Sequence, residues 1–286
     1  MKQDAFSRMH PAVNLIFFVG ALGFGVVIQH PFFLLVGIVC AFAYYLLLHG
    51  KQGIKRIAMM LPVFLAVIFL NPLINRNGQN VLCVIFGMSY TLEALIYGAV
   101  LSGMFLTMIL WFACYSKVIT GDKFTTLFGN LAPSLSLLLV MIFRMVPNLI
   151  RKGKQIAGAR QSIGKNMSDK AEAMTVLGCL TTWTLEGGIV TADSMRSRGY
   201  ATAKRTSFAI YRMTLRDWII LAVMLMLAGV VIGMMAAGEA TATFTPQWYI
   251  APTNVTALVI YCTYLLIPTL LHIEEGLVWH ISRSKI

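Results

Sequence analysis

Six long apolar runs alternate with polar segments along the chain, at residues 12–28, 32–48, 57–74, 91–116, 217–237 and 253–271. Each run is long enough for a helix to cross about 30 Å of hydrocarbon. The first two runs are separated only by Gln29, His30 and Pro31, so we expect a tight helical hairpin with the helix breaker at its turn. The pattern predicts an all-α polytopic membrane protein with about six transmembrane helices.

A polar and strongly basic segment, residues 117–216, separates the fourth run from the fifth. It contains an apolar stretch, residues 135–143, that is too short to cross a membrane comfortably and is followed by Arg144 and Pro147. We expect a long helix that starts near Pro133, because proline is favoured in the first turn. We expect it to kink at Pro147, where one backbone hydrogen bond is lost.

A second long helix is expected from Asp169 to Arg198. Asp169 suits the N-cap, with Glu172 three residues later, and Gly199 occupies the position that usually takes a left-handed conformation. Small and apolar residues recur on this helix at spacings of three and four and form one stripe: Val176, Leu180, Trp183, Gly187, Val190 and Ser194. Gly187 and Gly188 leave room for another backbone to cross closely.

Composition and charge agree with a membrane protein whose two termini lie in the cytoplasm. The chain is 58% hydrophobic and 12% charged, whereas soluble domains carry about 25% charged residues. Because basic residues prefer the cytoplasmic side, this topology places all of the 23 Lys and Arg residues except Arg76 there. The net charge of +12 therefore mostly reflects the basic residues of the cytoplasmic segments. Because no basic domain stands apart from the apolar runs, we expect no nucleic-acid partner.

The same pattern predicts three parts in one polytopic unit. Residues 1–116 form the N-terminal transmembrane helices 1–4, residues 117–215 form the two long cytoplasmic helices, and residues 216–286 form the C-terminal transmembrane helices 5–6.

Residues that usually carry chemistry are scattered. The five cysteines share no CxxC or Cys/His spacing, and the five histidines lie far apart near the ends of the apolar runs, so neither set predicts a metal site. The stretch from Gly158 to Gly164 differs from a phosphate-binding loop because five residues, not four, separate its glycines and Asn166 replaces Ser or Thr. We expect no catalytic residues, metal or cofactor in this chain.

Two other classes of membrane protein would leave different signals. A secondary carrier, independent of ATP, usually shows an internal repeat, broken helices or charges at the membrane midplane. A membrane-embedded enzyme such as a lipid transferase needs paired carboxylates or a metal cluster at the interface. Neither signal is visible in this sequence, and neither class explains the basic insertion. The secondary carrier, independent of ATP, is kept as the alternative function.

Each of the two long helices in the insertion is predicted to end in a cationic tip. Arg196 and Arg198 lie in the last turn of the second helix, and Arg160 and Lys165 lie at the end of the first. Cations near a helix C-terminus can simply stabilise its exposed carbonyls, by about 0.3–1 kcal/mol each. Because the feature occurs twice, we also interpret the tips as two contacts for acidic grooves of a partner.

Four stretches make the chain resemble the T component of energy-coupling factor (ECF) transporters, the family that includes the cobalt-transport permeases. They are HPAVNLIFF near the start, TLEALIYG at 91–98, DKFTTLFGNLAPSLSLLLVMIFRMVPNL at 122–149 and TADSMRSRGYATAKRTSFAIYR at 191–212. The last two are the more specific.

This resemblance implies an energy-coupling subunit of an ATP-driven importer in the bacterial inner (plasma) membrane. Two ABC-type ATPases, which bind ATP and Mg, are expected to dock onto two coupling helices, and a small membrane-embedded S component to bind a vitamin or metal ion. Each coupling helix of the family ends in a short Ala/Ser-Arg-Gly signature whose arginine enters a groove of one ATPase. The chain itself is then a non-catalytic permease subunit within the lipid bilayer.

Carried over to this sequence, the second signature is intact as Ser197-Arg198-Gly199, preceded by Arg196. The first departs from the pattern and has two possible registers. It reads either Ala159-Arg160-Gln161, with glutamine in place of glycine, or as a signature that ends at Gly164, with Ile163 in place of arginine. The departure predicts that the two ATPase docking sites are unequal. Arg144, Pro147, Gly187 and Gly188 are expected to shape the coupling region.

Overall fold

The structure is a computed structural model that describes residues 5–75, 81–85, 88–129, 132–165, 169–200, 211, 213–240, 242–243, 249–250, 252 and 254–283. Its described residues divide into two compact units, the first formed by residues 1–120 and 212–286 and the second by residues 121–211. Arg76 and Asn166 lie outside the described residues.

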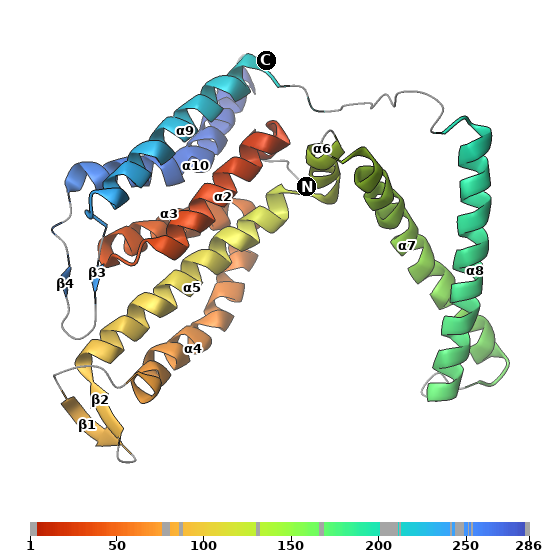
Figure 1. Ribbon diagram of the computed structural model, residues 1–286, viewed down its shortest axis with the longest axis horizontal. Helices are drawn as coiled ribbons and strands as arrows, with labels where there is room; N and C mark the ends of the chain where they lie inside the picture. Colours follow the sequence, from red (N-terminus) through yellow and green to blue (C-terminus); the bar gives the residue numbers. More distant parts are fainter. Residues whose placement is uncertain are drawn as a thin grey trace. The chain divides into compact units, whose positions relative to one another are not determined.

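The first unit holds the helices that correspond to the six apolar runs (Figure 1). They are α2 (Pro11–Val27), α3 (Pro31–His49), α4 (Lys51–Ile74), α5 (Leu92–Val118), α9 (Leu215–Ala236) and α10 (Val255–Arg283), with a short α1 (Ala5–Arg8) before them. The predicted membrane fold is therefore confirmed. The last helix continues well beyond the predicted end at residue 271.

Two local signals explain where these helices begin. Both α2 and α3 start with proline after histidine, and the His10 side chain accepts a hydrogen bond from the Ala12 N–H at 3.3 Å. The fixed backbone angle of proline and its missing N–H suit this first position. Helix α9 begins with a capping box in which Thr214 and Asp217 each bond the other's backbone N–H.

Aromatic rings fill the core of this unit between α1, α2, α3, α5 and α10. Trp111 of α5 is fully buried and contacts Phe17 of α2 at 5.4 Å and Tyr44 of α3 at 6.2 Å between ring centroids. Tyr264 of α10 stacks on Phe17 and donates a hydrogen bond to its carbonyl at 3.2 Å. A Cβ at Gly20 would lie 2.1 Å from the Tyr264 hydroxyl, so glycine is required for this close approach.

Two ion pairs connect α1 and the start of α9 to the last part of α10. Arg8 of α1 lies 2.9 Å from Glu275 of α10, and Arg216 at the start of α9 lies 3.3 Å from Glu274. Helix α1, the start of α9 and the last part of α10 therefore lie on the same side of the bundle.

Two short antiparallel hairpins were not predicted from the apolar pattern. One pairs β1 (Val81–Ile85) with β2 (Met88–Thr91), and the other pairs β3 (Ala242–Thr243) with β4 (Tyr249–Ile250). Each joins two consecutive membrane helices.

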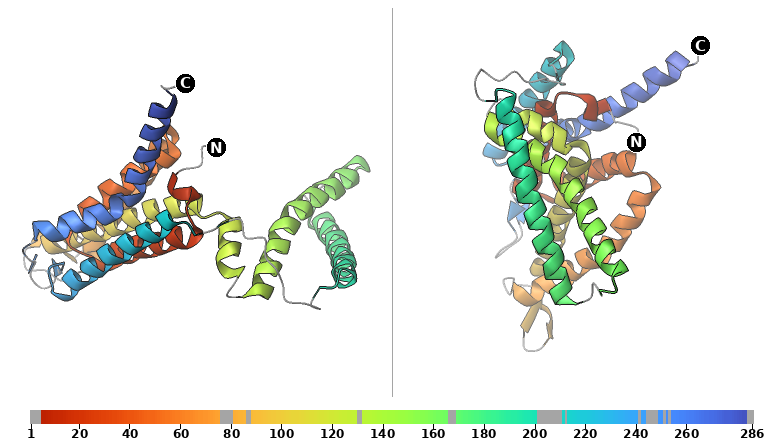
Figure 2. Two further views of the ribbon diagram at one scale, coloured as in Figure 1. Left: turned by 90° about the horizontal axis from the view of Figure 1, so that it is seen from above. Right: turned by 90° about the vertical axis from the view of Figure 1, so that its right-hand side faces the viewer.

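The second unit consists of α6 (Gly121–Gly129), α7 (Pro133–Ser162) and α8 (Lys170–Ser197), as Figure 2 shows from two further directions. The long helices match the two predicted for the insertion, with proline in the first turn of α7 and Pro147 inside it. The short α6 was not predicted; the Ser136 hydroxyl of α7 donates to its Thr125 carbonyl at 3.1 Å.

By length and composition, seven of the described helices could cross a membrane: α3, α4, α5, α7, α8, α9 and α10. The α2 helix, with 17 residues, is slightly shorter. Helix α7 differs from the membrane helices of the first unit in its charge, because it carries five basic residues and no acidic one. Helices α7 and α8 are the two for which the sequence predicts a cytoplasmic position.

Candidate functional site

The C-terminal end of α8 is a complete Schellman motif. Gly199 takes a left-handed conformation with φ +74°, and its N–H donates to the Arg196 carbonyl at 3.0 Å. The Tyr200 N–H donates to the Met195 carbonyl at 3.1 Å, which is the second hydrogen bond of the motif. The sequence prediction that Gly199 ends this helix is confirmed, and Arg198 occupies the C-cap.

The predicted signature residues of α8 form an exposed cationic tip. Arg196, Ser197, Arg198 and Gly199 are all exposed. The Ser197 hydroxyl donates to the Asp193 carbonyl of its own helix at 2.8 Å. Within the part of the chain that the structure describes, neither arginine has an ion-pair partner. Two guanidinium groups therefore project from the end of a 28-residue helix.

The end of α7 has the same backbone geometry. Gly164 takes φ +82°, its N–H donates to the Gln161 carbonyl at 3.0 Å, and the Lys165 N–H donates to the Arg160 carbonyl at 3.2 Å. Gly164 is therefore equivalent to Gly199, and Ser162 precedes it by two positions as Ser197 precedes Gly199.

This equivalence favours, of the two registers that the sequence left open, the one that ends at Gly164. The residue equivalent to Arg198 is Ile163, whose exposed fraction is 78%. Gln161 takes the place of Arg196. Both cationic positions of the α8 tip are therefore uncharged in α7, and Arg160 lies three residues before the cap position that Ile163 occupies.

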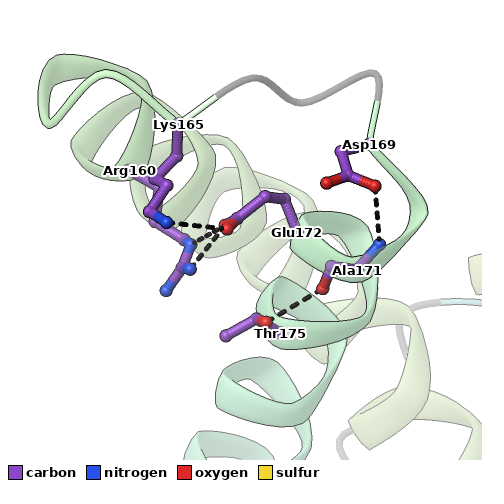
Figure 3. Close-up of polar contacts among 6 residues, drawn as sticks. All are labelled: Arg160, Lys165, Asp169, Ala171, Glu172 and Thr175. Atoms are coloured by element: carbon purple, nitrogen blue, oxygen red, sulfur yellow. Dashed lines mark hydrogen bonds and ion pairs between the residues drawn. The ribbon is translucent and has the colours of Figure 1, made fainter.

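Arg160 instead pairs with Glu172 in the first turn of α8 (Figure 3). Its Nε donates to Glu172 Oε2 at 2.7 Å, and its terminal nitrogen Nη2 contacts the same oxygen. The Lys165 ammonium lies 3.5 Å from the other carboxylate oxygen. The Arg160 side chain is 27% exposed and that of Glu172 13% exposed, so the contact is partly shielded from water. We call this group of three residues the Arg160–Glu172 clamp.

The clamp changes the ionisation of Glu172, which precedes the apolar stretch of α8. Hydrogen bonds from Arg160 hold the pKa of Glu172 below its ordinary value, and the charges of Arg160 and Lys165 act in the same direction. The carboxylate is therefore in its charged form near neutral pH.

The predicted N-cap of α8 is confirmed, but Glu172 does not complete a capping box. The Asp169 side chain accepts the Ala171 N–H at 3.3 Å, as an N-cap does, and Figure 3 shows it beside the clamp. The Glu172 carboxylate points toward Arg160 rather than back to the N-cap backbone. The carboxylate turns away from the N-cap because Arg160 and Lys165 of α7 lie beside it.

Helices α7 and α8 pack antiparallel, with α8 using only the first half of its predicted stripe. Val176 is buried, and Leu180 approaches Gly153 of α7 so closely that a Cβ there would lie 3.0 Å from its Cδ1. Further along, Lys152 of α7 lies over the Trp183 ring, 5.8 Å from its centroid. An open groove of about 520 Å³ lies beside this crossing.

The other residues expected to shape the region are not brought together in the second unit. Arg144 and Pro147 are exposed on α7, and a Cβ on Gly187 or Gly188 would meet no atom of the α7–α8 hairpin within 4 Å. The helices approach closely at Gly153, and not at Gly187 and Gly188 as predicted from the sequence. Gly153 could not be recognised in advance, because a single glycine in a basic helix forms no periodic pattern.

Neither the clamp nor the contact of Lys152 with Trp183 was predicted from the sequence. The clamp was recognisable in principle, because an antiparallel hairpin brings the last turn of its first helix to the first turn of its second. Across the described residues, no three His, Cys, Asp or Glu side chains lie close enough together to hold a metal ion.

Comparison with known proteins identifies one family. The family model described as cobalt transport protein (CbiQ) matches residues 3–208. The match covers well over half of the chain, including both α7 and α8 with their caps. No curated protein matches the chain.

Proposed function

The chain belongs to the cobalt transport protein family, the T components of ECF transporters, and on that basis we propose that it couples ATP hydrolysis in partner subunits to import. It is a transport permease and a multi-pass membrane protein. In the proposed complex, two ABC-type ATPases dock at the ends of α7 and α8. They bind ATP and Mg, while a small S component in the bilayer binds a vitamin or metal ion.

The exposed pair Arg196 and Arg198 at the end of α8 carries this proposal. Coupling requires a connection that is stiff and does not slip when the ATPases close. Guanidinium suits it, because its planar set of donors can pair with a carboxylate through two parallel hydrogen bonds, unlike the point charge of lysine. The Schellman motif fixes the backbone on which Arg198 lies.

The proposed location is the bacterial inner membrane, with both termini and the α7–α8 hairpin in the cytoplasm. The charge distribution supports it, since α7 has five basic residues and no acidic one. The pairing of Arg8 with Glu275 supports the placement of both termini on one side.

Purification of the tagged chain from gently solubilised native membranes tests the proposal. Two ABC ATPases and a small hydrophobic protein are expected with the wild type, and the ATPase that docks on α8 should be lost in Arg198→Ala. Removing one partner of a buried ion pair costs about 3–5 kcal/mol, which corresponds to a loss of affinity of about 100-fold or more. Arg198→Lys should retain part of the affinity because the charge remains without the planar fork.

Arg151→Ala is the matched control. Arg151 is also an exposed arginine of the hairpin, but it contacts Asn148 of its own helix and lies away from both tips. It should leave ATPase binding unchanged. A chain that purifies alone and takes up solute without ATP would contradict the proposal and favour a secondary carrier.

A further inference from the structure

The two helix ends share one backbone geometry but differ in chemistry, and this difference carries an inference about the partners. Both ends are Schellman motifs with matching hydrogen bonds, so side chains at equivalent positions leave the backbone in equivalent ways. At the C-cap, α8 presents Arg198 and α7 presents Ile163. One tip therefore offers a cation where the other offers an apolar side chain.

We propose that α7 docks through Ile163 in an apolar groove of an ATPase chain different from the one that binds Arg198, so that the ATPase pair is a heterodimer. This inference rests on the proposed function, because it names the partners of the same two tips.

Arg160 does not replace the missing cation. Its Nε and Nη2 are both directed at Glu172, and its side chain is only 27% exposed. The neighbouring Lys165 also lies beside Glu172, at 3.5 Å. The cationic groups of Arg160 and Lys165 therefore lie against Glu172 of α8. Ile163 is exposed, with an exposed fraction of 78%.

A pair of identical ATPases fits this arrangement poorly. Two copies of one chain would present the same groove to both tips. A groove with a carboxylate for Arg198 would then bury that carboxylate against Ile163 without a partner, which is unfavourable because a buried charge needs a counter-charge. A groove shaped for Ile163 would bury Arg198 with the same difficulty. Two different grooves remove the conflict.

The two tips are also far enough apart to contact separate chains. Because the helices pack antiparallel, the end of α7 lies with the start of α8, and the end of α8 lies at the opposite end of that helix. Helix α8 has 28 residues, which at 1.5 Å per residue is about 42 Å. Each tip can therefore have its own partner.

The test uses the ATPase chains that co-purify with the wild-type protein. Each is presented singly and without nucleotide to the full chain in nanodiscs, and its affinity is measured for the wild type, Ile163→Asp, Ile163→Leu and Arg198→Ala. Ile163→Asp should weaken one ATPase by at least about tenfold, because a carboxylate would be buried in an apolar groove. Arg198→Ala should weaken only the other. Ile163→Leu, which conserves volume and polarity, is the control and should bind both as the wild type does.

The outcomes separate this inference from the proposed function. Unchanged binding of both ATPases by Ile163→Asp would overturn the inference, as would a single ATPase species present in two copies. In either case release by Arg198→Ala would leave the proposed function standing. If no ABC ATPase accompanies the wild type, the proposed function fails and the inference with it. Retained binding of the second ATPase shows that Ile163→Asp is folded.

Discussion

The Schellman motif at Gly199 makes a quantitative prediction about docking. Its backbone φ of +74° is left-handed, a conformation that costs residues with a Cβ about 1–2 kcal/mol. Gly199→Ala should therefore shift the equilibrium from the capped end toward a frayed one by about 5–30-fold. Arg198 precedes this residue, so fraying moves its guanidinium away from the groove. The affinity for the ATPase that docks on α8 should fall by up to the same factor.

Two other glycines supply matched controls for Gly199→Ala. Gly164 has φ +82° and Gly238, at the end of α9, has φ +84°, and both ends have the same pair of cap hydrogen bonds. Gly164→Ala should weaken only the ATPase that docks on α7. Gly238→Ala carries the same backbone strain but lies at neither tip, so it should lower thermal stability and leave both affinities unchanged.

The assay is a titration of the chain in nanodiscs with each ATPase, followed by a thermal melt of every variant. Gly199→Asn provides a graded test, because asparagine tolerates the left-handed region better than alanine does; its loss of affinity should be smaller. Equal weakening by Gly199→Ala and Gly238→Ala would refute the reasoning, because the effect would then come from general destabilisation. No weakening by Gly199→Ala would show that the position of Arg198 does not depend on the cap.

Two further predictions concern the hairpin itself. Because Arg160 lowers the pKa of Glu172, the clamp should stabilise the fold fully above the ordinary pKa of glutamate and lose this contribution as the pH falls through the lowered value. A pH series of thermal melts should show this loss in the wild type but not in Glu172→Gln; parallel curves would contradict it. Gly153→Leu should destabilise the chain by about 1–3 kcal/mol, because Leu180 fills the space beside Gly153. Gly187→Leu, where no hairpin atom lies nearby, should stay within about 0.5 kcal/mol of the wild type in the same melts, and the reverse order would show that the helices cross at Gly187.

The elements of this fold were predictable where local signals act alone. Apolar runs located the membrane helices, Pro133 located the start of α7, and Asp169 and Gly199 marked the ends of α8. The hairpins β1–β2 and β3–β4 were missed because short strands between apolar helices leave little periodicity.

Contacts between helices were harder to predict than the helices themselves. A stripe at spacings of three and four shows which face of α8 can pack, but it does not say how far along the helix a partner extends. Leu180 and Trp183 lie against α7, whereas Val190 of the same stripe is 60% exposed. The register of the first signature was open for a similar reason, because only the backbone hydrogen bonds show that Gly164 is equivalent to Gly199.

The partial contact between the helices gives the two tips different mechanical support. The contacts of α8 with α7, and the α8 residues that line the groove beside it, all fall between Glu172 and Leu185 in the described chain. The α7 tip is therefore held by the clamp and the crossing. From Gly187 to Ser197 the residues of α8 are exposed, with Met195 half-buried, and this part amounts to about 16 Å of helix. The cationic tip thus lies at the end of a single helix, whereas the Ile163 tip lies where two helices are joined by ionic contacts. An ATPase bound at Arg198 would transmit its movement through one helix, and an ATPase bound at Ile163 would move both helices of the hairpin together. In the proposed complex, the difference between the tips therefore extends from their chemistry to the way in which each would pass on movement.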